Sequence, residues 1–224
     1  MTSVVEGNTV PDRPDGTYDL ISRVPVIPVL TIESVNTGLP LARALVAGGL
    51  PLLEITLRTV AALDVIRAIA QEVQGAVVGA GTVLTPDDFA AAERAGAEFI
   101  VSPGTTGRLL DAAGDRDLPF LPGAATASEV MGLLERGYRC VKFFPAEPAG
   151  GAAYLKSLAA PLPEARFCPT GGIDAARAKT YLALSNVVCV GGSWVAPEAA
   201  VAAGDWAAIT ALAQAAQDLR VVPS

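Results

Sequence analysis

Along this chain a short apolar or β-branched run is followed, about every 20 to 25 residues, by an Ala/Leu-rich amphipathic stretch. Such a pair is typical of one βα unit. The runs lack clean alternation of polar and apolar residues, which favours parallel strands covered by helices on both faces. Eight strands are predicted in this way, at residues 24–30, 52–57, 76–80, 99–102, 120–122, 140–144, 166–169 and 187–190.

Helical signals lie between these runs. The predicted helices cover residues 39–48, 61–73, 86–95, 128–135, 174–183 and 206–219, and we expect the last to pack across the outside or bottom of the domain. Eight βα units in 224 residues imply a single α/β domain, a closed (β/α)8 TIM barrel. Residues 1–16 show no periodicity and are predicted to be a flexible N-terminal arm, with residues 17–224 forming the barrel domain.

The chain contains no histidine, and this absence narrows the chemistry it can perform. Ser-His-Asp and Cys-His nucleophile systems are excluded, as is zinc bound by histidine. Acid–base work must therefore fall to carboxylates, tyrosine, lysine or water. The three cysteines, Cys140, Cys168 and Cys189, each lie in an apolar run without CxxC spacing, so we predict buried free thiols.

The charge balance is acidic, with 23 Asp and Glu residues against 16 Lys and Arg residues and a net charge of −7. Because the arginines are scattered, nucleic acids and anionic membranes are disfavoured as partners. No apolar run approaches the roughly 20 residues of a membrane span. The first residues also lack the basic start and apolar stretch of a secretory signal, which predicts a cytoplasmic protein.

Lys142 has an unusual setting, the apolar and aromatic run Cys140-Val141-Lys142-Phe143-Phe144-Pro145. Desolvation disfavours the charged ammonium, and a neutral amine can attack a ketone to form a Schiff base. The alternative is a strand-end lysine whose ammonium reaches solvent. The other two lysines, Lys156 and Lys179, are expected to be solvated on helices.

Glu54 lies in a strand where residues 54, 56 and 58 share one face by the period of two. Without histidine it is the best available general base, able to move protons directly or through one water. An internal ion pair with Arg58 or Lys142 is the alternative, and the motif alone leaves both interpretations open. The planar fork of Arg58 suits a substrate carboxylate such as that of a 2-keto acid.

Further polar residues gather at the carboxyl ends of the predicted strands, where barrels of this type carry their active sites. Thr82 and Thr170 could hydrogen-bond the substrate carboxylate or the reacting oxygens. Pro103 and Phe144 stand at the same ends, and we expect them to line the substrate site.

Paired glycines follow the seventh and eighth predicted strands, as Gly171-Gly172 and as Gly191-Gly192-Ser193. Glycine lets backbone N–H groups approach an anion closely, and a following helix N-terminus favours negative charge. The pair therefore predicts a phosphate site. Tight βα turns are the alternative explanation.

Two segments carry a family resemblance. Residues 49–58 and residues 137–150, which include Lys142-Phe143-Phe144-Pro145, resemble the 2-keto-3-deoxy-6-phosphogluconate (KDPG) and 4-hydroxy-2-oxoglutarate (KHG) aldolases. The resemblance extends from about residue 20 to about residue 215, and continues through residues 78–83, 102–104, 167–173 and 191–194. The departures are the longer N-terminal arm and the uncharged Val60, neither of which affects the motifs.

The resemblance implies roles for individual residues. The Schiff-base lysine of the family falls on Lys142 and its acid–base glutamate on Glu54, while its contacts to the pyruvate carboxylate fall on Arg58 and Thr82. Its phosphate contacts fall on Gly171, Gly172, Gly191, Gly192 and Ser193.

The resemblance also implies an activity. It implies a homotrimer without metal or cofactor that cleaves KDPG to pyruvate and glyceraldehyde 3-phosphate, and often 4-hydroxy-2-oxoglutarate to pyruvate and glyoxylate. The partners would thus be a small-molecule 2-keto acid and an aldehyde. Two alternatives stay open: a phosphosugar-binding barrel of the epimerase or synthase kind without covalent chemistry, and a catalytically silent trimeric scaffold.

Overall fold

Strands and helices alternate along the chain in the computed structural model, which describes residues 16–114 and 116–219. The strands are β1 (Val26–Leu30), β2 (Leu52–Thr56), β3 (Val77–Gly81), β4 (Phe99–Val101), β5 (Phe120–Leu121), β6 (Gly123–Ala124), β7 (Cys140–Phe143), β8 (Arg166–Pro169) and β9 (Val190–Gly192). The helices are α1 (Thr17–Ile21), α2 (Val35–Ala47), α3 (Ala62–Glu72), α4 (Pro86–Arg94), α5 (Gly107–Gly114), α6 (Ala127–Glu135), α7 (Gly151–Leu158), α8 (Ala175–Leu182), α9 (Glu198–Ala203) and α10 (Trp206–Gln217).

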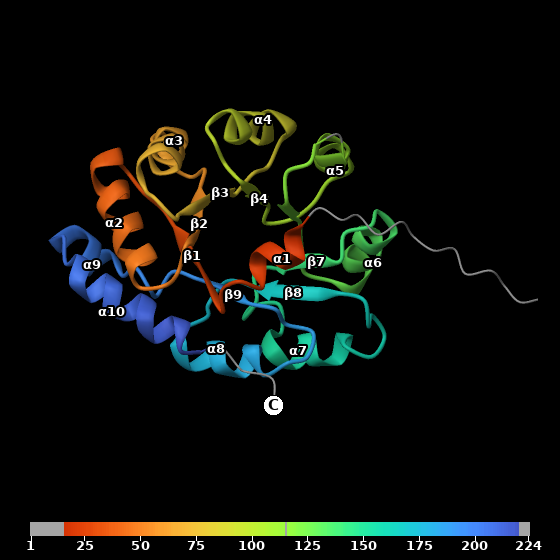
Figure 1. The fold of residues 1–224 in the computed structure, drawn as a ribbon. Coiled ribbons are helices and arrows are strands. Elements are labelled where there is room, and N and C mark those ends of the chain that lie inside the picture. Colours follow the sequence, from red (N-terminus) through yellow and green to blue (C-terminus); the bar gives the residue numbers. More distant parts are fainter. Residues whose placement is uncertain (1–15, 115, 220–224) are drawn as a thin grey trace, which may run out of the picture.

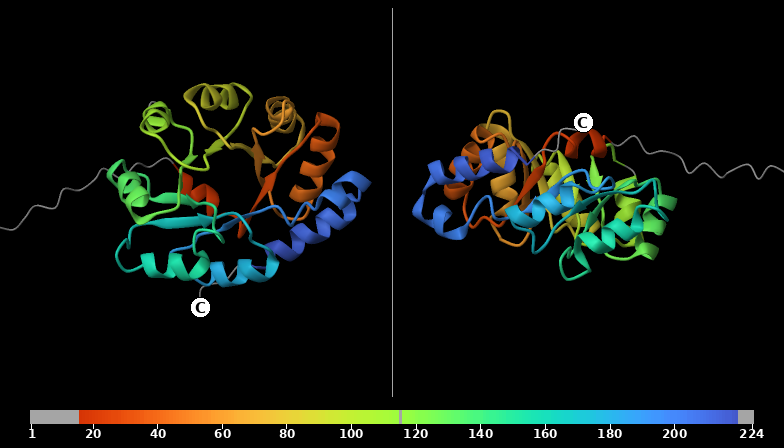
Figure 2. Two further views of the ribbon diagram at one scale, coloured as in Figure 1. Left: turned by 180° about the vertical axis from the view of Figure 1, so that it is seen from behind. Right: turned by 90° about the horizontal axis from the view of Figure 1, so that it is seen from below.

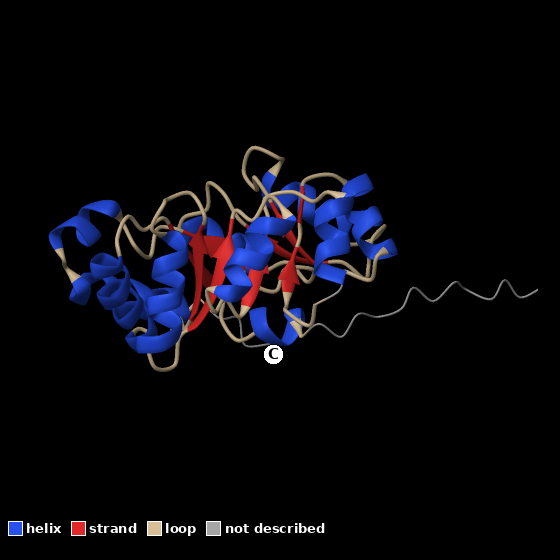
Figure 3. Cartoon of the chain, turned by 90° about the horizontal axis from the view of Figure 1, so that it is seen from above, coloured by secondary structure: helices blue, strands red, loops and turns tan. Residues whose placement is uncertain are grey.

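The strands form two parallel sheets. The larger has six strands in the order β5-β4-β3-β2-β1-β9, and the smaller has three in the order β6-β7-β8. Two isolated parallel bridges, Phe167 to Val187 and Thr170 to Gly191, connect the β8 segment with the β9 segment. The six-stranded sheet curls into a half-barrel, and α2 to α10 lie around the outside of the strands (Figures 1 and 3). The α/β class and the parallel strands are thus confirmed.

The structure differs from the prediction of eight strands in one continuous barrel. The run at 120–122 is divided at Pro122, so that β5 pairs with β4 while β6 pairs with β7. Proline has no N–H for the ladder, although the Pro122 carbonyl still accepts from Lys142 N at 2.8 Å. The last strand begins later than predicted, since β9 starts at Val190 and Val187 makes only an isolated bridge.

Side-chain caps mark the starts of α2, α4, α6, α8 and α10. Thr85 and Thr126 each form a capping box, with Asp88 and Glu129 respectively, at the start of α4 and α6. The helix predicted from residue 39 begins earlier, because Ser34 accepts from Thr37 N and caps α2. The periodicity does not predict four of the helices, namely α1, α5, α7 and α9. All four are eight residues long or shorter, which leaves little room for a periodic pattern.

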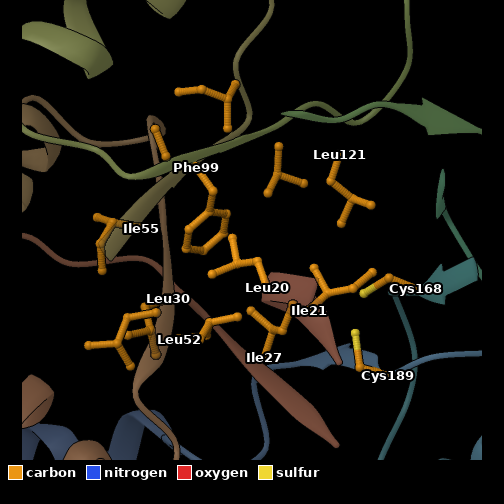
Figure 4. Packing of buried hydrophobic residues seen from close by; sticks show 14 of the residues in the cluster. Leu20, Ile21, Ile27, Leu30, Leu52, Ile55, Phe99, Leu121, Cys168 and Cys189 are labelled. Atoms are coloured by element: carbon orange, nitrogen blue, oxygen red, sulfur yellow. The ribbon is translucent and has the colours of Figure 1, made fainter. Parts of the chain in front are cut away.

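Helix α1 lies within the ring of strands in Figure 1. Its Leu20 and Ile21 are buried and pack near Ile27, Cys168 and Cys189 (Figure 4). Because α1 leads into the start of β1, this packing closes the amino ends of the strands and leaves the carboxyl ends for a site. The predicted arm lies outside the described residues except for Gly16, which precedes α1.

Helix α10 packs on the outside against α2, as predicted (Figure 2). Thr210 Oγ1 donates to the Ala44 carbonyl at 3.1 Å. Gly48 allows this approach, since a Cβ there would lie only 2.4 Å from the Ala213 Cβ.

The three cysteines are free and buried, which confirms the prediction. A hydrogen bond with Cys168 and complete burial raise the pKa of the Cys189 thiol, so it stays protonated and unreactive. In the part of the chain that the structure describes, no helix is both long and apolar enough to cross a membrane.

Candidate active site

Strands β2 and β7 bring Glu54 and Lys142 together inside the ring of strands. Lys142 Nζ donates to Glu54 Oε1 at 2.9 Å, and the two side chains are only 6% and 3% exposed. Phe143 stacks on Tyr154 of α7, so its neighbour Lys142 faces the opposite side of the strand, toward the interior. The solvent-reaching alternative for Lys142 is therefore wrong.

The ion pair predicted as an alternative role for Glu54 is present, with Lys142 rather than Arg58 as its partner. An ion pair does not exclude acid–base work. A general base must lie within hydrogen-bond distance of an amine to take its proton, and the Glu54 carboxylate meets this condition for Lys142. The same contact thus fits both interpretations.

Gly81 at the end of β3 makes room for the Glu54 carboxylate. A Cβ atom at Gly81 would lie 2.2 Å from Glu54 Oε1 and 2.6 Å from its Cγ, so that no other residue fits beside this rotamer. The sequence shows the glycine motif around residue 80. It does not show which neighbouring residue requires a glycine there, because cross-strand contacts depend on the stagger of β2 and β3.

A cleft of about 790 Å³ opens at the carboxyl ends of β1, β8 and β9, within the usual size of small-molecule sites. Eight of the predicted site residues line it: Arg58, Phe144, Thr170, Gly171, Gly172, Gly191, Gly192 and Ser193. Neither Lys142 nor Glu54 is part of this lining. Phe144 links the cleft to the buried pair, since Lys142 Nζ lies 5.5 Å from the centroid of its ring.

Arg58 lies on the wall of this cleft and is exposed. Among residues 16–114 and 116–219, none forms a salt bridge or hydrogen bond with its guanidinium. An unpaired guanidinium in a cleft is suited to a carboxylate or phosphate of a ligand.

Four glycines of the cleft have packing reasons of their own. Gly171 and Gly172 adopt φ of +106° and +76°, which side-chain residues rarely adopt. A Cβ at Gly191 would lie 2.2 Å from Thr170 Oγ1, and one at Gly192 would lie 1.7 Å from the Trp194 ring. Turn geometry and close packing thus account for glycine here, and anion binding stays a prediction.

Thr82 and Pro103 follow β3 and β4 but are not part of the cleft lining. Thr82 adopts a left-handed φ of 58° directly after Gly81. The Pro103 loop is fixed by its neighbours, because Ser102 Oγ accepts from Gly123 N at 3.2 Å and Thr105 Oγ1 donates to Gly123 O at 2.8 Å. Gly123 of β6 is the register partner of Lys142 in β7, so these hydrogen bonds hold the Pro103 loop beside β7.

Sequence reasoning placed Thr56 on one strand face with Glu54 and Arg58 but gave it no role, and the structure buries it at the end of β2. Its hydroxyl lies 3.1 Å from that of Thr31, which lines the cleft, and donates to the Leu30 carbonyl at 2.9 Å. The pair ties the end of β2 to the end of β1.

The described residues contain no group of three histidine, cysteine, aspartate or glutamate side chains that could hold a metal ion. The side chains of the site supply a buried amine, a carboxylate in contact with it, and an unpaired guanidinium in the cleft. Such a set can form an imine with a ketone and move protons around it.

A family model and two sequence relatives that match this chain belong to one family. The family model for KDPG and KHG aldolase matches residues 18–212. The 2-dehydro-3-deoxy-phosphogluconate aldolase of Pseudoalteromonas atlantica is 52% identical over 198 residues, which are 88% of this chain and 92% of the relative. The KHG/KDPG aldolase of Escherichia coli is 49% identical over 197 residues, 88% of this chain and 92% of that protein.

Solved structures agree with the sequence relatives. The KDPG aldolase of Legionella pneumophila, with pyruvate captured as a covalent carbinolamine, has a TM-score of 0.88 and 44% identity, covering 90% of this chain and 98% of that one. The KDPG aldolase of Zymomonas mobilis with 3-phosphoglycerate has a TM-score of 0.86 and 48% identity, covering 92% and 97%.

Proposed function

The chain belongs to the KDPG and KHG aldolase family, and from this premise we propose that it is a class I aldolase, a carbon–carbon lyase, with Lys142 as its Schiff-base residue. It cleaves KDPG to pyruvate and glyceraldehyde 3-phosphate, and 4-hydroxy-2-oxoglutarate to pyruvate and glyoxylate. The observation that carries the proposal is the buried contact of 2.9 Å between Lys142 Nζ and Glu54 Oε1. The Legionella relative, which holds pyruvate as a covalent carbinolamine, supports it.

The mechanism begins with proton transfer within the buried pair. Glu54 accepts a proton from Lys142, and the neutral amine attacks the C2 ketone of the substrate. Glu54 returns the proton as the carbinolamine loses water, which leaves an iminium at C2. The iminium acts as the electron sink for the next step.

Cleavage follows from the same two residues. Glu54, directly or through one water, removes the proton of the C4 hydroxyl as the C3–C4 bond breaks and the aldehyde leaves. The electron pair of that bond passes into the iminium and gives the enamine of pyruvate. Protonation of the enamine at C3 and hydrolysis of the resulting iminium release pyruvate and restore Lys142.

We assign substrate orientation to residues that follow the carboxyl ends of the strands. Arg58 and Thr82 bind the carboxylate next to the ketone, and Pro103, Phe144 and Thr170 line the reacting part of the substrate. The terminal phosphate binds at Gly171, Gly172, Gly191, Gly192 and Ser193. Support comes from the cleft, which is lined by Arg58, Phe144, Thr170 and all five phosphate residues.

We further propose that the two sheets are parts of one closed (β/α)8 barrel, a single domain over residues 17–224. The segments β5 and β6 are separated only by Pro122 and pair on opposite sides, which makes them two parts of a fifth strand. The bridges between the β8 and β9 segments support closure on the other side. A homotrimer, a cytoplasmic location and independence of metal and cofactor complete the proposal, and light scattering in solution tests the trimer.

Borohydride trapping tests the proposed function. Reduction in the presence of pyruvate should fix one pyruvate per chain on Lys142, identified by peptide mass spectrometry. The matched controls are Lys156 and Lys179, which lie on α7 and α8 and should carry no label. If Lys142 carries no label, the aldolase proposal is wrong, and a non-covalent phosphosugar-binding barrel or a catalytically silent scaffold replaces it.

A further inference from the structure

The segment that follows β7 runs beside the segment that follows β8. Ala146 N donates to Thr170 O at 2.8 Å, and Glu147 N donates to Gly171 O at 3.1 Å. These bonds join the continuation of the Lys142 strand to the Gly171-Gly172 loop, which lines the cleft. The position of Glu147 therefore bears directly on the shape of that loop.

The Glu147 side chain is held at both of its oxygens by residues of α8. Tyr181 donates its hydroxyl to Oε1, and Arg177 Nε lies 3.3 Å from Oε2. Arg177 is itself fixed, because its Nη1 pairs with Asp174 Oδ2 at 2.7 Å and its backbone N–H donates to the Asp174 side chain. Glu147 is thus tied to the first two turns of α8.

Tyr181 is only 1% exposed, whereas Glu147, whose carboxylate it holds, is partly buried. Burial and the hydrogen bond to Glu147 raise the pKa of its phenol, so the proton stays in place for donation. The Tyr181 hydroxyl holds the carboxylate from the interior, whereas the Arg177 side chain is half-exposed. The buried partner therefore sets the geometry.

Gly172 rests against the stem of this glutamate. A Cβ at Gly172 would lie 2.9 Å from both Cβ and Cγ of Glu147, so the loop has no room to shift toward it. Glu147 itself is not part of the cleft lining. Arg177 offsets only part of its negative charge, because the same guanidinium also pairs with Asp174.

We propose that Glu147, held by Tyr181 and Arg177, is a positioning residue that fixes the Gly171-Gly172 loop to receive the terminal phosphate of the substrate. The inference rests on the proposed function for the identity of that substrate. It adds that phosphate affinity depends on three side chains that do not touch the ligand. Glu147 acts through its backbone bond to Gly171 and its contact with Gly172, and Arg177 Nη1 also donates to the Gly172 carbonyl at 3.5 Å.

The test compares three variants with a matched control. Glu147→Ala removes the contact with α8, Tyr181→Phe removes one hydroxyl, and Glu147→Gln keeps an oxygen that can accept from Tyr181. The control is Glu164→Ala, which breaks an exposed ion pair of similar length, 2.9 Å to Arg139, ahead of β7 and β8 at the opposite end of these strands. Each is measured for cleavage of KDPG and of unphosphorylated 2-keto-3-deoxygluconate, and for binding of inorganic phosphate by calorimetry.

We expect Glu147→Ala to raise KM for KDPG and Kd for inorganic phosphate by roughly tenfold, with kcat within about twofold of wild type. Values for the unphosphorylated substrate should not change. Tyr181→Phe should show part of the effect and Glu147→Gln should recover most of it, while Glu164→Ala matches wild type. If kcat falls equally for both substrates, or if phosphate binding does not change, the positioning role is wrong.

Failure of the positioning role and failure of the aldolase proposal give different results. A wild-type protein that cleaves neither substrate would overturn the aldolase proposal, whereas the phosphate titrations would still decide the role of Glu147. Should Glu147→Ala fail to fold, Tyr181→Phe and Glu147→Gln supply the same comparison.

Discussion

Lys142 Nζ and Glu54 Oε1 lie 2.9 Å apart in a nearly solvent-free interior, although 88 residues separate them in the chain. Such a pair is costly to bury, and removal of one partner leaves a charge without compensation. Replacement of both by apolar residues would be neutral or stabilising, so stability alone does not explain the pair. The proposed catalytic role would explain the pair, and the difference can be measured.

Lys142→Met should abolish pyruvate release and destabilise the fold by about 3 to 5 kcal/mol, because Glu54 loses its partner. The double variant Lys142→Met/Glu54→Leu should recover stability to within about 1 kcal/mol of wild type and remain inactive. Urea denaturation and a coupled assay for pyruvate give the two readouts. Residual turnover in either variant would contradict the Schiff-base role of Lys142.

Glu54→Gln retains the size of the side chain and a hydrogen-bond acceptor for Lys142, but it cannot exchange protons at neutral pH. We expect kcat to fall by roughly 10²- to 10⁴-fold, the usual contribution of a general acid–base group. Pre-steady-state trapping with borohydride should show slower imine formation on Lys142. A kcat close to wild type would mean that Glu54 only pairs with the lysine, which is the alternative that the sequence leaves open.

Much of this pair was predictable because both residues break a strong pattern. Charged residues in apolar strands are rare, and their places on the second and sixth predicted strands put both at the same end of a barrel. The apolar runs likewise located most of the strands, since such runs act within a few residues of sequence.

Other features depended on neighbours that are remote in sequence. The division of the fifth strand at Pro122 follows from pairing with different strands on its two sides. The contact between Tyr181 and Glu147 joins positions 34 residues apart through the packing of α8. Neither feature has a signature in the neighbouring sequence. The same is true of Gly191, which is glycine because a Cβ there would lie 2.2 Å from Thr170 Oγ1.

Arg58 should control affinity for the substrate carboxylate. Arg58→Ala should raise KM at least about tenfold, in line with loss of hydrogen bonds to a charged group, and Arg58→Lys should recover only part because it lacks the bidentate fork. Arg43→Ala is the control, since Arg43 pairs with Glu72 at 3.9 Å on the outer helices. Equal KM values for the Arg58 variants and wild type, from steady-state kinetics with pyruvate-forming substrates, would remove Arg58 from the site.

Gly81 offers the sharpest test of the site geometry, because it touches no substrate in the proposed mechanism. Gly81→Ala would place a methyl group 2.2 Å from Glu54 Oε1 and 2.6 Å from Glu54 Cγ, so the carboxylate must rotate away from Lys142. We expect kcat to fall at least about tenfold, with slower borohydride trapping on Lys142, because proton transfer requires hydrogen-bond distance.

The control for Gly81→Ala is Gly132→Ala on α6, where a Cβ would have no atom within 4 Å. That variant should keep full activity and gain up to about 1 kcal/mol in stability, since alanine favours a helix over glycine. Circular dichroism and thermal unfolding establish that both variants are folded. If folded Gly81→Ala retains the wild-type kcat, the contact between Glu54 and Lys142 is not required in the free enzyme, and Glu54 acts through a water instead.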